Sequence, residues 1–446
     1  MSIRPHGDAH QDPDTDIQAP VDIGLAERLF DELRQRTSTD RGITRASYGL
    51  GEQIAHDMVR REARKLGLDV SSDAAGNLYM TMKGREAGPA IFIGSHLDSV
   101  PMGGNFDGAA GVLLGLSVLS GYVGARIRPL RDITVMAIRA EESTWFGASY
   151  IGSRAAFGLL SAEELDHVKR SSDQIPLGAA VDAAGGDTAA LRAGNAFLDA
   201  TKIALFIEPH IEQGPVLLER RLPVGIVTGI RGSFRYRDAR CVGTYAHSGA
   251  TPREYRQDAV RATAALVVEL DEAWTRLSRE GADLVVTFGQ FFTDPAEAAF
   301  SKIAGQVSFS LDVRSEESQT LDRMKTILSD IRAKIEAEHG VRFELGSLTA
   351  STPARMDKNL VNALSDLAQK LDIETQTMAC GAGHDAAVFA SAGVATGMVF
   401  IRNAHGSHNP EEQMEMADFA EAARLLSALC LDLPLRLSSQ GAAAIA

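Results

Sequence analysis

The spacing of apolar residues predicts alternating helices and buried strands along most of the chain. Apolar positions recur at helical intervals over Asp22 to Arg36 and over Gly51 to Leu66, which predicts two amphipathic helices. Four short apolar runs that end in polar residues are typical of buried parallel strands: AIFIGSHLDSV, DITVMAIRAEES, IALFIEPHIEQG and GMVFIRNAHGSHNP. An apolar helix over Ala109 to Leu119 follows the first run. This alternation predicts an α/β fold with a mostly parallel sheet.

The middle of the chain has a different order of elements. From about Val224 to Glu344 the pattern predicts two strands, a long helix, two further strands and a second long helix. The predicted helices span Asp258 to Arg279 and Leu321 to His339, and the later strands span Leu284 to Phe291 and Gln306 to Arg314. We interpret this part as an α+β unit inserted into the α/β domain. The predicted division is therefore an N-terminal extension (1–20), a first α/β part (21–223), the insertion (224–345) and a second α/β part (346–446).

Composition narrows the class of protein and its surroundings. The 446 residues are 45% hydrophobic and 23% charged, which is ordinary for a globular chain. A net charge of −14 is opposite to the basic footprint of a nucleic-acid binder. Three separate cysteines (Cys241, Cys380, Cys430) form no disulfide framework and no thiolate zinc motif, which favours a reducing compartment. The most apolar stretch is too short to span a membrane. We expect a soluble, cytoplasmic protein with no nucleic-acid or membrane partner.

Histidine or carboxylate side chains lie at or just after the end of each of the four apolar runs. In run order they are His96 with Asp98, Glu141 with Glu142, His210 with Glu212, and His405 with His408. A further carboxylate, Asp107, lies in the Gly-rich loop after the first run. Because ligands bind outside the carboxyl ends of the strands of an open parallel sheet, these residues are expected to share one site.

The residue types favour a metal centre that carries out hydrolysis. Imidazole and carboxylate ligands without thiolate are typical of hydrolytic zinc or manganese sites. A carboxylate on a flexible loop, such as Asp107, can bridge two metal ions. The pair Glu141 and Glu142 offers one carboxylate as a ligand and one as a base, provided that the chain has left regular β geometry there.

Other catalytic chemistries lack their motifs. The sequence contains no G-x-S-x-G elbow, no phosphate-binding G-x-x-x-x-G-K-[ST], no H-E-x-x-H and no G-x-G-x-x-G after a strand. Cys380 near His384 is the one local candidate for a nucleophilic cysteine.

Seven segments occur in an order that resembles a known family. They are GSHLDSVPMGGNFDGAAGVLLGL, RAEESTWFGASYIGS, HIEQGPVLL, AHSGATP, LDVRS, GAGHDAAVFA and GSHNPEE. Together they resemble the hydantoinase/carbamoylase branch of the dinuclear metallopeptidase and amidohydrolase superfamily. This branch contains N-carbamoyl-L-amino-acid amidohydrolases, allantoate amidohydrolases and β-ureidopropionases, and the resemblance covers roughly residues 25 to 431.

The resemblance implies two divalent metal ions, Zn²⁺ or Mn²⁺, and a role for each residue at the strand ends. His96, Asp107 and His210 are expected to hold one ion, and Asp107, Glu142 and His408 the other. Glu141 is the expected general base, and Asp98 is expected to orient His96, although Asp98 could instead cap its loop. Glu212 is expected to be structural and His405 a bystander.

The resemblance also implies that the inserted unit is a lid through which two subunits form a homodimer. His247, in AHSGATP, is expected to reach the partner subunit's active site and to help polarise the scissile carbonyl. Each active site would then be shared between two subunits. The alternative for His247 is a turn residue that packs beside Pro252.

Substrate binding is implied for five further residues. Gln213 and Arg314 match positions that bind a carboxylate, and Arg235 falls where a basic residue is common. His384 is expected to line the site. Ser301 departs from the family, because the usual asparagine would supply an amide donor that a serine lacks.

These expectations favour a hydrolase that cleaves the ureido (N-carbamoyl) group of a small anionic substrate, such as an N-carbamoyl-L-amino acid, with release of the amine, ammonia and carbon dioxide. An allantoate-type amidohydrolase and a deacylase or dipeptidase that cleaves plain amide bonds are the alternative enzymes. A catalytically inactive binding protein on the same fold is the alternative from another class.

Overall fold

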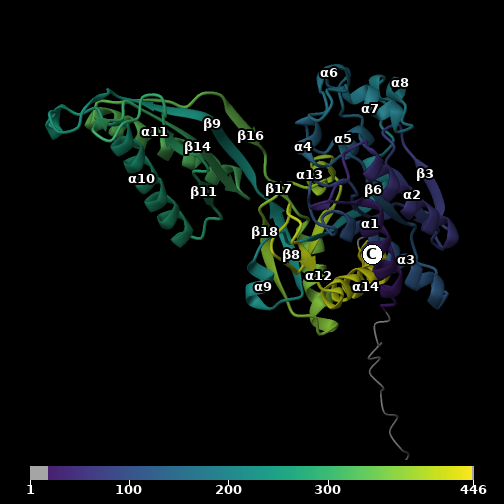
Figure 1. Ribbon diagram of the computed structural model, residues 1–446. Helices are drawn as coiled ribbons and strands as arrows, with labels where there is room; N and C mark the ends of the chain where they lie inside the picture. Colours follow the sequence, from purple (N-terminus) through teal and green to yellow (C-terminus); the bar gives the residue numbers. More distant parts are fainter. Residues whose placement is uncertain (1–18, 444–446) are drawn as a thin grey trace, which may run out of the picture.

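The computed structural model describes residues 19–443, with side chains described to residue 431. The predicted N-terminal extension lies outside this range except for its last two residues. Figure 1 shows two lobes: a large one built on a nine-stranded sheet, and a smaller one built on a six-stranded sheet.

The nine-stranded sheet forms the centre of the large lobe. Its strand order is β17-β8-β19-β7-β5-β6-β4-β3, with β18 paired to β8. The four central strands, β19 (Thr396–Ile401), β7 (Ile203–Ile211), β5 (Ala90–His96) and β6 (Ile133–Ile138), are parallel to one another. The outer strands are β3 (Asp69–Ser72), β4 (Leu78–Met82), β8 (Val224–Ile230), β17 (Ala354–Arg355) and β18 (Thr375–Cys380).

The prediction of a mostly parallel sheet is wrong, because the sheet is mixed. The pairs β3–β4, β4–β6, β8–β19 and β8–β17 are antiparallel. Buried strands read as continuous apolar runs whichever way their neighbours point, so the pattern of apolar residues does not reveal their direction. The parallel core nevertheless places the carboxyl ends of β5, β6, β7 and β19 at one edge.

Helices cover both faces of this sheet and enclose two apolar cores. One core joins the sheet to the helices α1, α2, α3, α12 and α14. These helices span Ile23–Thr37, Leu50–Lys65, Ala109–Ala125, Lys358–Lys370 and Met416–Ala443. The other core lies under α13 (Ala386–Ser391), where Phe389 stacks on Phe206 of β7 with ring centroids 3.7 Å apart. The Gly-rich sequence of α3 suits its place, because this helix is buried nearly all round between the sheet and α1 and α14.

The six-stranded sheet is antiparallel and carries two long helices. It contains β9 (Gly232–Val242), β11 (Val285–Thr287), β12 (Phe291–Thr293), β14 (Gln306–Ser315), β15 (Arg342–Glu344) and β16 (Leu348–Ser351). Along β14 every second residue is buried, which matches the two-residue period of a strand with one covered face. That face packs on α10 (Ala259–Arg279) and α11 (Ser318–His339).

Two details of the middle region differ from the pattern-based prediction. The single strand expected over Leu284 to Phe291 forms two short strands, β11 and β12, which pair with different parts of β14. Strand β8, expected in the inserted unit, pairs in the nine-stranded sheet instead. The chain passes between the lobes at Arg231, whose side chain forms a bidentate ion pair with Asp283.

The remaining elements are short. They are the helices α4 (Ser143–Phe146), α5 (Ile151–Ala156), α6 (Ala162–His167), α7 (Leu177–Ala183), α8 (Thr188–Arg192) and α9 (Val216–Arg220), the 3-10 helices η1 (Ala200–Lys202) and η2 (Arg253–Tyr255), and the strands β1 (Ser38–Thr39), β2 (Gly42–Ile43), β10 (Ala246–His247), β13 (Lys302–Ile303), β20 (Asn403–Ala404) and β21 (Gln413–Met414). All three cysteines are buried and free. Within residues 19–443, no helix is long and apolar enough to cross a membrane.

Candidate active site

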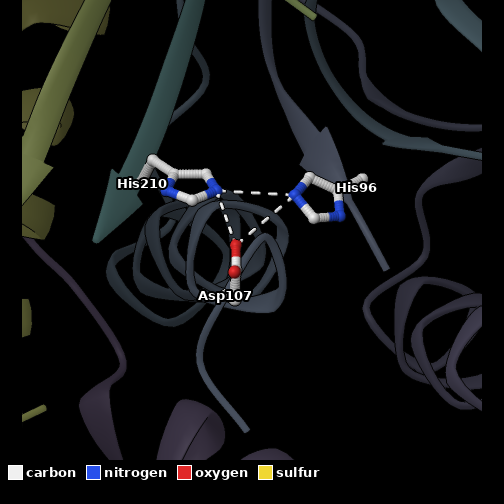
Figure 2. A group of neighbouring side chains, drawn as sticks. All are labelled: His96, Asp107 and His210. Carbon is white, nitrogen blue, oxygen red and sulfur yellow. Dashed lines mark hydrogen bonds and ion pairs between the residues drawn. The ribbon is translucent and has the colours of Figure 1, made fainter. Parts of the chain in front are cut away.

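His96 ends strand β5 with one ring nitrogen already occupied. Its Nδ1 atom lies 3.1 Å from the carbonyl oxygen of Asp98 and 3.3 Å from the Asp98 carboxylate. Both neighbours are acceptors, so Nδ1 donates to them and Nε2 is left to face the other side chains of the site. Figure 2 shows this Nε2 atom turned toward Asp107 and His210.

His210 on β7 is held in the same way. Its Nδ1 atom lies 2.9 Å from the carbonyl oxygen of Ile211, and its Nε2 atom is 3.1 Å from Asp107 Oδ1. The Nε2 atoms of His96 and His210 are 3.4 Å apart. With both Nδ1 atoms engaged elsewhere, the two Nε2 atoms and the Asp107 carboxylate converge on one point, which is the arrangement that a bound cation requires.

Asp107 lies between two groups of possible ligands. Its Oδ1 atom faces His96 and His210, and its Oδ2 atom lies 3.2 Å from His408 Nε2. Glu142 Oε1 is 3.4 Å from the same His408 nitrogen. Although burial would raise the pKa of Asp107, its contacts with His210 and His408 hold that pKa well below 3.8.

The side chains therefore form two groups that share Asp107. One is His96–Asp107–His210, and the other is Asp107–Glu142–His408. In each group, one ligand atom per residue lies within 4.8 Å of the others. Asp107 Oδ1 is buried and has no hydrogen-bond donor among the described residues. Imidazole and carboxylate donors in this arrangement suit Zn²⁺ or Mn²⁺.

The Glu141–Glu142 pair follows a break in regular β structure. Strand β6 ends at Ile138, and Ala140 adopts a φ of 53°, which turns the chain out of the sheet. The backbone N–H groups of Glu141 and Glu142 donate to the two carboxylate oxygens of Asp98, each at 3.1 Å. Burial raises the pKa of Glu141 well above 4.5 and that of Glu142 to about 7. Glu141 Oε2 is 4.0 Å from His96 Nε2.

Asp98 thus contacts His96 and both glutamates. Its carboxylate also accepts a hydrogen bond from the Ser47 hydroxyl at 2.6 Å. A carboxylate with these partners fixes the imidazole and the two glutamates at the same time, which a simple loop cap would not do.

A cavity of about 310 Å³ opens beside the two groups of ligands and reaches the small lobe. Arg235 of β9 and Arg314 of β14 line it together with His96, Asp107 and Glu141. The two arginines flank one carboxylate: Arg235 Nε lies 3.3 Å and Arg314 Nη2 lies 2.8 Å from Asp312. With one carboxylate between two guanidinium groups, the side of the cavity formed by the small lobe has an excess of positive charge that suits an anion.

Gln213 and His384 line the same cavity with unpaired polar atoms. Gln213 has a φ of 62°, and its side-chain N–H donates to Asp107 Oδ2 at 3.0 Å. Its oxygen is buried and has no partner within residues 19–431. Both ring nitrogens of His384 likewise lack partners there, and burial lowers its pKa well below 6.5.

His247 and Ser301 lie elsewhere in the small lobe and do not line this cavity. Strand β10 pairs His247 with Lys302 of β13, next to Ser301. Both residues are exposed. The Nδ1 atom of His247 accepts backbone hydrogen bonds from Gly249 and Ala250, which leaves Nε2 for other contacts.

The three residues considered as alternatives have other surroundings. The Glu212 carboxylate accepts the N–H groups of Val216 and Leu217 at the start of α9, a structural role. His405 is exposed and does not line the cavity. Cys380 is buried, its thiol bonds to the carbonyl of Ala382, and burial raises its pKa to about 12, so it is not an activated nucleophile.

The sequence analysis missed several residues that shape the site. They are Ser47, Tyr150, Asp312, Ser407 and Glu412. All of them except Ser47 lie inside quoted motifs, but the contacts that give them a role come largely from distant parts of the chain.

An α/β fold whose strand ends bring together imidazole and carboxylate donors beside a buried glutamate is typical of metal-dependent hydrolases. The model of peptidase family M20/M25/M40 matches residues 92–432. The chain belongs to this family, and within it to the hydantoinase/carbamoylase branch. It is a hydrolase that acts on carbon–nitrogen bonds of linear amides.

Relatives and solved structures agree on this assignment. An N-carbamoyl-L-amino-acid amidohydrolase from Pseudomonas sp. (strain NS671) is 31% identical, over 87% of this chain and 92% of that protein. The allantoate amidohydrolase of Escherichia coli (strain K12) is also 31% identical, over 88% and 93%. A crystal structure of a hydantoinase/carbamoylase family amidase from Burkholderia multivorans superposes with a TM-score of 0.82 at 28% identity, covering 93% of this chain and 98% of that one.

Proposed function

We propose that the protein hydrolyses the ureido group of a small carboxylate, such as an N-carbamoyl-L-amino acid, and releases the amine, ammonia and carbon dioxide. The observation that carries this proposal is the shared cavity. It places Arg235 and Arg314, which suit a carboxylate, opposite the imidazole and carboxylate cluster, which suits the hydrolysis of an amide. The names of the relatives support the same reaction class.

The two groups that share Asp107 would hold two divalent ions, Zn²⁺ or Mn²⁺. When bound, such ions polarise the scissile carbonyl and lower the pKa of water. The chain prepares for them by engaging the Nδ1 atoms of His96 and His210 with backbone carbonyls, so that both Nε2 atoms face Asp107.

Glu141 is proposed as the general base and acid. It lies on the cavity wall 4.0 Å from His96 Nε2, and its raised pKa suits a group that takes and returns a proton near neutral pH. Glu141 would accept the proton of the attacking water and return it to the departing nitrogen. Asp98 would hold the Glu141 backbone and the His96 ring in position during both steps.

The substrate carboxylate would lie against the two arginines. Arg314 also donates to the carbonyl of Gly381, so its guanidinium is fixed from two sides before substrate binds. Gln213 was expected to bind the same carboxylate, but its side-chain amide group donates to Asp107. Its unpaired oxygen suits an N–H donor such as a ureido nitrogen. His384, whose lowered pKa favours the neutral ring, would be a further hydrogen-bonding partner for the substrate.

The small lobe, which is formed by about residues 232 to 351, is proposed to act as a lid and as the homodimer contact. His247 and Ser301 share an exposed surface away from the cavity of their own chain. They would therefore act in the partner subunit's site, where His247 would polarise the carbonyl. We place the protein in the cytoplasm, in keeping with its free cysteines.

The test is product release by chelator-treated protein reloaded with Zn²⁺ or Mn²⁺. The substrates are N-carbamoyl-L-amino acids, N-carbamoyl-β-alanine and allantoate, assayed for ammonia, and N-acetyl amino acids and dipeptides, assayed for free amine. Metal-dependent ammonia from an N-carbamoyl acid is the expected result. Ammonia from allantoate alone would move the substrate to the allantoate type. Amine from acyl or peptidyl substrates without ammonia would contradict the ureido proposal and favour a deacylase or dipeptidase.

A further inference from the structure

Two loops that are about 300 residues apart in sequence meet behind Asp107. The first is the Gly-rich loop between β5 and α3, which carries Asp107. The second runs from β20 to β21 and carries Ser407, His408 and Glu412. Because β20 pairs with β21, the two ends of the second loop are held together.

Glu412 joins these loops with both of its carboxylate oxygens. Its Oε1 atom accepts the backbone N–H groups of Phe106 and Asp107, at 2.8 and 3.2 Å. Its Oε2 atom lies 2.7 Å from the hydroxyl of Ser407, and that hydroxyl lies 2.6 Å from Asp107 Oδ2. Glu412 therefore contacts Asp107 twice, directly at the backbone and through Ser407 at the side chain. It is 5% exposed, so water does not compete for these bonds.

Gly104 shows that the first loop is built around Glu412. A Cβ atom added to Gly104 would lie 2.1 Å from Glu412 Oε1 and 2.5 Å from its Cβ atom. Gly104 does not have a positive φ, so its backbone conformation alone does not require glycine. The missing side chain leaves the space that the Glu412 carboxylate occupies.

We propose that Glu412 is a positioning residue that holds the Asp107 carboxylate between the two groups of ligands. Asp107 must present one oxygen to His96 and His210 and the other to His408 and Glu142, so rotation of its side chain would weaken both groups. Glu412 fixes the backbone of Asp107, and Ser407 fixes the oxygen that faces His408. Partners of metal ligands commonly change metal affinity by about 10–100-fold when they are removed.

The test is calorimetric titration of the chelator-treated full chain with Zn²⁺. Glu412→Ala is expected to weaken binding by at least about tenfold. Gly104→Ala, which keeps Glu412 but displaces it, is expected to do the same. Glu412→Gln is expected to bind within about threefold of wild type, because its amide oxygen accepts both backbone N–H groups and its amide N–H donates to Ser407. Ser407→Ala, which keeps the backbone bonds, is expected to show an intermediate loss.

Asp418→Ala is the matched control. Asp418 is a buried carboxylate six residues further along the chain that pairs with Arg402 at 2.8 Å. Its loss is expected to lower thermal stability without a change in Zn²⁺ affinity. Wild-type affinity in Glu412→Ala and Gly104→Ala would overturn the inference, as would a Glu412→Gln variant as weak as Glu412→Ala.

This inference rests on the proposed metal cluster and not on the proposed substrate. A wild-type chain that binds no Zn²⁺ would overturn the cluster and the inference together. Normal zinc binding with no ammonia release would contradict the proposed reaction and leave the role of Glu412 standing.

Discussion

The two regions that are expected to carry catalysis differ in how completely one chain builds them. The ligand cluster is buried apart from His408, and His96, His210 and Asp107 are each at most 3% exposed. Each of these residues also has a second partner that fixes it. The surface around His247 is exposed, rests on the two-residue strands β10 and β13, and does not line the cavity.

The difference teaches that one chain brings the cluster together by itself, whereas the role proposed for His247 requires a partner subunit. A cluster whose ligands all come from the large lobe should tolerate loss of the small-lobe contacts and still bind metal. The exposed surface should affect turnover without affecting metal content. The predictions below test this division of roles.

The largest effect is expected for Glu141→Gln. The amide cannot accept the proton of the attacking water, so activity should fall by about 10²–10⁴-fold or more. Glu141 belongs to neither group of proposed ligands, so metal content should be unchanged. Activity assays paired with elemental analysis check both statements, and near-normal turnover would remove Glu141 from the mechanism.

A smaller loss, about 10²–10³-fold, is expected for His247→Ala, because one donor to the developing oxyanion is removed. If His247 serves the partner subunit, mixing this variant with Glu141→Gln and letting subunits exchange should restore activity. Random pairing gives hybrid dimers in about half of the cases, each with one complete site, hence about a quarter of wild-type activity. A mixture no more active than its components would show that His247 does not act across subunits.

Asp98→Asn is expected to weaken metal binding by about 10–100-fold and to lower activity in parallel. The amide would turn an N–H group toward the N–H of Glu141 or Glu142, where the carboxylate now accepts both. Excess metal should recover only part of the activity, since Glu141 loses its support as well. Full recovery at high metal concentration would show that Asp98 only orients His96 and does not support Glu141.

The smallest effect is expected for Arg314→Lys. Lysine keeps the charge but loses the planar pair of donors, so KM for a carboxylate substrate should rise by about tenfold with little change in kcat. Arg323→Lys is a suitable control, because Arg323 pairs with Glu280 and does not line the cavity. A fall in kcat alone would contradict the role in substrate binding.

Much of the cluster could be predicted because it depends on strand ends. Parallel strands bring their carboxyl ends to one edge, so His96, Glu142 and His210 needed no knowledge of the strand order to be grouped. The family motifs then separated His408 from His405, which lies three residues away in the same loop. The structure places His408 against Asp107 and Glu142 on the cavity wall, whereas His405 does not line the cavity.

The supporting residues could not be predicted, since their partners are set by tertiary contacts. Glu412 accepts a hydrogen bond from Asp107, which is 305 positions away in the sequence, and the pattern of apolar residues does not predict such a pair. Asp312 becomes the shared partner of two arginines only once β9 and β14 are in register. The direction of the outer strands was missed for the same reason.

The central claim is that Asp107 joins two metal sites within one chain. Elemental analysis of the chain after chelator treatment and reloading with Zn²⁺ tests it directly, with Asp107→Ala beside the wild type. The account predicts close to two ions per wild-type chain and near-complete loss of both in the variant. One ion or none in the wild type, or two ions in Asp107→Ala, would contradict it.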